Sequence, residues 1–177
     1  MHTEIPTLDR LLAAHAAQIG RDLPAYRNHT YRVVNLCAAL SSPEGPTLEK
    51  FALAAAFHDL GIWTDGTWDY LEPSVAQATA HLAATDRAAW TEVIAAMIRE
   101  HHKITPYRGP AGPTVETFRQ ADWIDVTRGL LRFGLRRSFL RALYSTWPDE
   151  GFHAFLVRQT WRRAKRHPLS PLPMFRW

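Results

Sequence analysis

The chain has 177 residues, of which 46% are hydrophobic and 21% charged, and its formal net charge is +4. This balance predicts a single globular domain over residues 1–177. The only cysteine, Cys37, excludes an internal disulfide and a zinc site built from cysteines. The longest apolar run, FALAAAF, is far shorter than the roughly 20 residues that cross a bilayer, so we expect a cytoplasmic protein without a membrane segment.

Helical patterns cover almost the whole chain, and strand signals are nearly absent. Residues that favour the first turn or the cap of a helix predict helix starts at Thr7, Pro24, Thr47, Pro73, Asp86 and Thr114. The expected helices cover residues 7–20, 24–41, 47–60, 73–81, 86–103, 114–129, 131–146 and 149–166. A loop is expected at 104–113 and an extended tail at 167–177. The pattern predicts an all-α fold, a single helical bundle.

The C-terminal third carries most of the positive charge, since residues 128–166 hold ten Lys and Arg against two acidic residues. Arg128, Arg132 and Arg136 recur at every fourth position beside Leu131 and Leu135, which predicts a basic amphipathic helix. Two interpretations stay open: a solvated face behind a core stripe, or a surface for nucleic acid or an acidic partner. The apolar tail and the seven Trp are also consistent with a homodimer contact.

Histidine and aspartate residues gather in the predicted helices or at their ends. The candidate metal ligands are His29, His58, Asp59, His101, His102 and Asp122. In a helical bundle, side chains from separate helices can converge on one ion. Imidazole and carboxylate ligands without thiolate suit Mn, Fe, Co, Ni or Zn, and a divalent ion of this kind can lower the pKa of bound water to about 7.

The ordered series HTYRV, AAAFHDLG, IREHHK and ADWID resembles the HD-domain superfamily over residues 24–130. The resemblance implies a helical fold in which His29, His58, Asp59 and Asp122 bind a divalent metal. It also implies a metal-dependent phosphohydrolase acting on a small phosphate ester or nucleotide. His101 and His102 are similar to the histidines that bind a second metal in some members. Ser74 stands where those members have a further histidine ligand, so one ion is expected rather than two.

Three residues are expected to support the metal chemistry. Lys103 follows His102 directly, and Arg128 lies six residues after Asp122, so either cation can hold a small anionic, phosphorylated substrate. A solvated surface position is the alternative for both cations. Asp125 is three residues after Asp122, a spacing that favours a carboxylate that orients a histidine ligand.

Two other functions stay open beside the phosphohydrolase. Some members of the superfamily are oxygenases with a two-iron centre, and others hydrate nitrile-like compounds. A non-catalytic sensor or adaptor with a structural metal is the third possibility. Metal content and the number of open coordination positions distinguish these classes.

Overall fold

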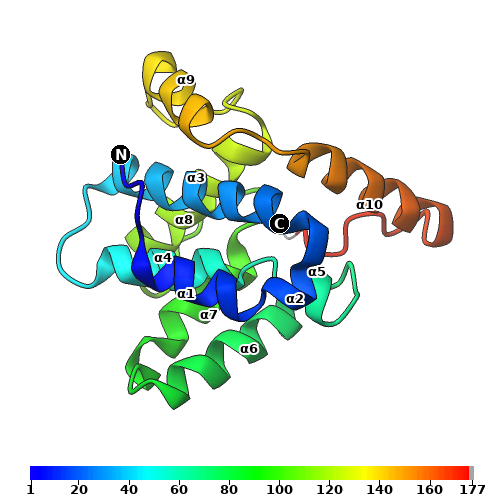
Figure 1. Cartoon of the computed structure of the whole chain (residues 1–177), viewed down its shortest axis with the longest axis horizontal. Helices are drawn as coiled ribbons and strands as arrows, with labels where there is room; N and C mark the ends of the chain where they lie inside the picture. Colours follow the sequence, from blue (N-terminus) through cyan, green and yellow to red (C-terminus); the bar gives the residue numbers. More distant parts are fainter. Residues whose placement is uncertain (176–177) are drawn as a thin grey trace.

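The computed structural model describes residues 1–175, and these residues form α-helices and two short 3-10 helices without any β-strand. The all-α prediction is therefore confirmed for the described part of the chain (Figure 1). The α-helices are α1 (Pro6–Ala14), α2 (Ala16–Ile19), α3 (Leu23–Ser41), α4 (Thr47–Phe57), α5 (Gly61–Thr64), α6 (Leu71–Ala84), α7 (Thr91–Glu100), α8 (Gly112–Val126), α9 (Arg137–Thr146) and α10 (Phe152–Arg166).

Helices α3, α4, α7 and α8 form the centre of the bundle. Helix α3 packs on α4 and α8, and α7 packs on the same two helices from another direction. The middle of α4 is buried on all sides, as its run of alanines predicts, because small side chains let neighbouring helices approach closely (Figure 1). The polar residues that directly follow α4 and α7, His58, Asp59 and His101, are buried inside the bundle.

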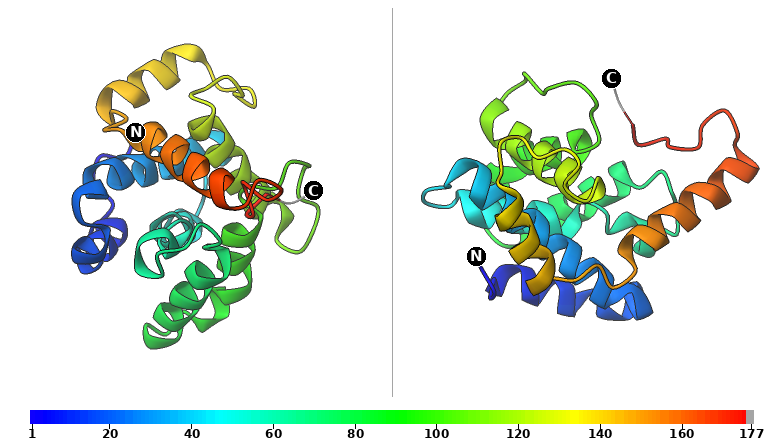
Figure 2. Two further views of the ribbon diagram at one scale, coloured as in Figure 1. Left: turned by 90° about the vertical axis from the view of Figure 1, so that its right-hand side faces the viewer. Right: turned by 90° about the horizontal axis from the view of Figure 1, so that it is seen from above.

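The C-terminal part lies outside this centre. Helix α10 extends away from the bundle, and the segment 167–175 turns back toward it (Figure 2). A second apolar cluster joins the first half of α10 and the end of the tail to α5 and the start of α6. Its buried members are Ile62, Tyr70, Leu71, Phe155 and Met174. The tail is thus packed against the body of the protein. None of the helices in residues 1–175 combines the length and the apolar character that a membrane span requires.

The predicted basic helix that contained Arg128, Arg132 and Arg136 is wrong. Residues 127–136 form turns, and α9 begins only at Arg137. Gly129 and Gly134 adopt φ values of +75° and +92°, in the left-handed region that glycine tolerates and an α-helix excludes. The repeat of arginines at every fourth position is therefore not on one helix face.

Other helix starts also differ from the prediction, most clearly in the first helix and in α7. The segment 7–20 divides at His15 into α1 and α2, and α1 is preceded by Ile5 rather than capped by Thr7. Asp86 has a φ of +53° and caps no helix, because α7 starts at Thr91 after a short 3-10 turn. These shifts move the helix ends without moving the histidines out of the bundle centre.

Candidate metal centre

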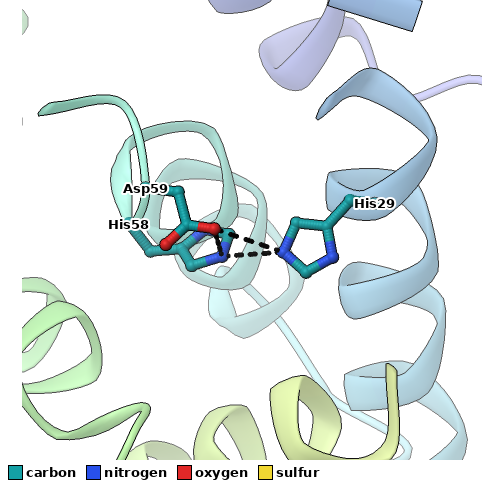
Figure 3. Close-up of side chains that lie close together, drawn as sticks. All are labelled: His29, His58 and Asp59. Atoms are coloured by element: carbon teal, nitrogen blue, oxygen red, sulfur yellow. Dashed lines mark hydrogen bonds and ion pairs between the residues drawn. The ribbon is translucent and has the colours of Figure 1, made fainter. Parts of the chain in front are cut away.

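Four candidate ligands from three helices meet in the centre of the bundle. His29 lies in the middle of α3, His58 and Asp59 follow the last residue of α4, and Asp122 lies on α8. Figure 3 shows His29 facing His58 and Asp59 across the space between α3 and α4. All four side chains are buried, with at most 5% of any of them exposed.

The ligand atoms of these residues lie within a few ångströms of one another. The Nε2 atoms of His29 and His58 are 2.9 Å apart, and Oδ2 of Asp59 lies 3.7 and 3.3 Å from them. Oδ1 of Asp122 lies 3.6 Å from His29 Nε2 and 3.8 Å from His58 Nε2. Two nitrogens and two carboxylate oxygens thus lie close together, and His29, His58 and Asp59 are near enough to one another to hold an ion.

The other ring nitrogen of each histidine fixes the direction of its lone pair. His58 Nδ1 donates to the carbonyl of Ala55 at 2.8 Å, and His101 Nδ1 donates to the carbonyl of Ile98 at 2.7 Å. His29 Nδ1 donates to Oδ2 of Asp125 at 2.7 Å. Because a carbonyl and an ionised carboxylate only accept, Nδ1 must carry the proton, which leaves Nε2 with a lone pair in the neutral ring. The Nε2 lone pairs of His29 and His58 then face each other at 2.9 Å, and a cation held by both atoms would relieve the repulsion between them.

Asp125 connects the site to a buried arginine. Arg32 donates from Nε to Oδ1 of Asp125 at 2.6 Å and from Nη2 to Oδ2 at 2.9 Å, and neither side chain is exposed. Burial opposes the ionisation of Asp125, but Arg32 and His29 hold its pKa well below the ordinary range. The structure therefore places Asp125 behind His29, the position of an orienting carboxylate. Arg32 was not among the predicted site residues, although Arg32 lies about one turn after His29 in the HTYRV motif.

The electrostatics of the cluster favour one positive charge at its centre. Burial disfavours the charged ring of His58, but the neighbouring Asp59 carboxylate and Asp122 raise its pKa to about 9. Burial also opposes ionisation of Asp59, and His58 and His101 nevertheless lower its pKa well below the ordinary value. Burial raises the pKa of Asp122 against the pull of these histidines. A bound cation supplies the same positive charge without a proton.

A second group of potential ligands lies on the other side of Asp59. His101 Nε2 is 3.6 Å from Oδ1 of Asp59, and His102 Nδ1 is 3.7 Å from Oδ2 of Asp122. Asp59, His101 and His102 have ligand atoms close enough together to hold an ion. Oδ1 of Asp59, Oδ2 of Asp122 and Nε2 of His101 are buried without a hydrogen-bond partner among the described residues. Buried polar atoms of this kind are costly unless they are paired, so the donor set fits a metal ion.

Ser74 stands in place of the histidine that the resemblance implies for a second metal, and it lies against the turn that follows Asp59. Its Oγ is buried and accepts a hydrogen bond from the backbone N–H of Gly61 at 3.0 Å. His81, about two turns further along the same face of α6, lies against the ring of Phe57. The chain of α6 therefore supports the turn after Asp59.

Aromatic side chains enclose the centre. Phe152 stacks on His29 with ring centroids 4.0 Å apart, and the hydroxyl of Tyr70 lies 2.7 Å from Nε2 of His102. Phe175, at the end of the described tail, stacks on the opposite part of His102 at 5.2 Å. The contacts of Tyr70 and Phe175 with His102 were not predicted, because no local motif connects either residue to position 102.

Lys103 and Arg128, the two side chains predicted to hold an anionic substrate, lie in different surroundings. The backbone carbonyl of Lys103 accepts hydrogen bonds from Arg119 at 3.0 Å and from Trp123 at 3.1 Å, which fixes the turn after His102 beside the cluster. Arg128 is exposed, and its guanidinium is 3.3 Å from the carboxylate of Asp149. Lys103 thus stays close to the candidate ligands along the chain, whereas Arg128 forms a surface ion pair.

Comparison with known families agrees with this geometry. The family model described as HD domain matches residues 26–127, which contain all six candidate ligands. A comparison with curated proteins finds no match, and neither does one with solved structures. Because the match covers more than half of the chain and the ligand positions meet in space, the protein belongs to the HD-domain family.

Proposed function

We propose that this protein is a metal-dependent hydrolase of a small phosphate ester or nucleotide. The observation that carries the proposal is the convergence of two histidine nitrogens and two carboxylate oxygens, 2.9 to 3.8 Å apart where paired, at a buried point on three helices. A divalent ion held there would supply an acidified water molecule and would offset negative charge on a phosphoryl group.

The residues of the chain have separate tasks in this proposal. His29 and His58 present their Nε2 atoms, while Asp125 and the carbonyl of Ala55 hold the rings in the required tautomer. Asp59 and Asp122 provide the charge that favours a divalent ion over a monovalent one. Manganese, cobalt, nickel, zinc and iron all suit this ligand set. Lys103 is the proposed contact for the anionic substrate, because it directly follows His102.

Metal content and phosphate release test the proposal together. We expect one ion per chain in the wild type by elemental analysis and release of phosphate from at least one member of a nucleotide and sugar-phosphate panel. Asp59→Asn should lose both. Asp65→Asn provides the matched control, because Asp65 is exposed and bonds only the nearby Thr64 and Gln77 among the hydrogen bonds resolved for it. A fully loaded wild-type protein that hydrolyses no phosphate ester would refute the proposal.

A two-iron oxygenase or hydratase is the second candidate. The unpartnered Oδ1 of Asp59 and Nε2 of His101 favour it, because they lie 3.6 Å apart beside His102 and leave room for a second set of ligand contacts. The hydrogen bond of Ser74 to Gly61 weighs against it. Two irons per chain, with oxygen consumption in the presence of a substrate, would establish this candidate over the first. A single ion without turnover of any substrate would support the adaptor.

A further inference from the structure

A surface pocket of about 610 Å³ lies outside the metal centre, between the second half of α10 and the segment that joins α5 to α6. Ile62, Thr67 and Trp68 form one wall, and side chains of α10 form the other. None of the candidate metal ligands lines it. In Figure 2, α10 extends away from the bundle, while the segment from α5 to α6 stays on the surface of the bundle.

Positive charge is concentrated on the α10 wall. Arg162, Arg163, Lys165 and Arg166 line the pocket together with His167, and no acidic side chain among residues 1–175 does. Within residues 1–175, no salt bridge joins any of these four cations to an acidic side chain. Cations in the last turn of a helix stabilise its dipole, which accounts for Arg163, Lys165 and Arg166 as helix residues. The helix dipole does not explain why these cations line a pocket whose other wall is uncharged and partly aromatic.

The two walls together match one class of ligand. Arginine side chains form paired hydrogen bonds with phosphate oxygens, and several of them in one pocket suit a short chain of phosphates. Trp68, which is partly exposed in the lining, offers a flat aromatic surface to a base. The pocket also has the volume that is usual for small-molecule sites, about 300–1,000 Å³. A nucleic acid strand instead requires a positive groove that follows its backbone.

We propose that this pocket binds a nucleoside polyphosphate, with the phosphates on Arg162, Arg163 and Arg166 and the base on Trp68. The pocket is a site apart from the metal centre. The inference therefore stands or falls independently of the proposed hydrolase activity.

Calorimetric titration of the metal-loaded protein with a methylene-bridged, non-hydrolysable nucleoside triphosphate analogue tests the site. Arg162→Gln combined with Arg166→Gln should weaken binding about tenfold or more, because each change removes a charged donor to phosphate. Arg141→Gln combined with Arg158→Gln is the control. It removes the same charge from exposed positions on α9 and α10 that do not line the pocket, so affinity should change by no more than about twofold.

Five results would overturn the proposal. The analogue could fail to bind, or both double variants could lose affinity equally, which would indicate a general effect of charge. Loss of binding in Asp59→Asn but not in the Arg162/Arg166 variant would place the ligand at the metal centre. Inorganic tripolyphosphate that binds as tightly as the analogue would remove the nucleoside from the assignment. A short single-stranded oligonucleotide that binds more tightly would assign the surface to nucleic acid instead.

Discussion

Replacing Asp125 with asparagine tests how the metal centre is held together. Asp125 is fully buried and accepts hydrogen bonds from Arg32 at 2.6 and 2.9 Å and from His29 at 2.7 Å. The change neutralises one partner of a buried ion pair. It also replaces one accepting oxygen with an amide NH₂, which cannot accept the hydrogen bonds that Arg32 and His29 donate. Loss of one partner from such a pair costs about 3–5 kcal/mol, so we expect the free energy of unfolding to fall by this amount.

Two assays measure the effect. Each kcal/mol corresponds to about 2–4 °C in a chain of this length, so the melting temperature of the metal-free protein should fall by about 6–20 °C in calorimetry. His29 also loses the acceptor that orients its ring. Loss of such an orienting partner weakens metal affinity about 10–100-fold, which a competition titration with a chelator of known affinity measures.

Controls distinguish this mechanism from a general loss of charge. Glu72→Gln removes the same charge from an exposed ion pair with Arg99, in which 58% of the glutamate side chain is accessible. The free energy of unfolding should therefore fall by only about 0–1 kcal/mol, and metal affinity should not change. Arg32→Met with Asp125→Leu removes both buried charges and should recover most of the stability without the affinity. An Asp125→Asn protein that melts like the Glu72 control and binds metal like the wild type would refute the reasoning.

Three further predictions concern the surroundings of the site. A Cβ on Gly61 would lie 2.8 Å from the carbonyl oxygen of Tyr70, so Gly61→Ala should lower the free energy of unfolding in urea by about 1–3 kcal/mol. Gly112→Ala is the control: a Cβ there would have nothing within 4 Å, so stability should change by no more than about 0.5 kcal/mol. Ser74→Ala leaves the Gly61 N–H without its acceptor and should cost about 1–3 kcal/mol, while elemental analysis finds the same number of ions per chain; a lost ion would make Ser74 a ligand. Burial opposes ionisation of Glu116, but hydrogen bonds from Arg119 and its neighbours lower its pKa. The folded pKa then lies below the unfolded one, so this stabilisation is present above the unfolded pKa and is lost as the pH falls through the folded pKa. Glu116→Gln should therefore be less stable than the wild type by about 1.5–3 kcal/mol at neutral pH, with the difference vanishing in acid; a gap that is constant across a pH series of denaturation curves would contradict this.

Much of the helical architecture could be predicted from local pattern. The alanine-rich run before His58 predicts a buried helix, and α4 is buried on all sides. The interval 127–136 shows the limit of this reasoning. Arginines repeat there with helical spacing, but Gly129 and Gly134 adopt left-handed backbone conformations, and the segment is a series of turns. Side chains that recur at every fourth position share one face only if the backbone between them is helical.

The sequence by itself determined which residue types were available for a metal site and in what order, because His29, His58, Asp59 and Asp122 occur in motifs that resemble one family. Only the tertiary structure decided which atoms of these residues face one another. The direction of a histidine lone pair depends on the partner of the other ring nitrogen, and for His29 that partner is Asp125, 96 positions away in the chain. Tyr70 and Phe175 reach His102 from still other segments. Contacts between distant segments depend on how helices pack, and no local pattern of residues records that packing.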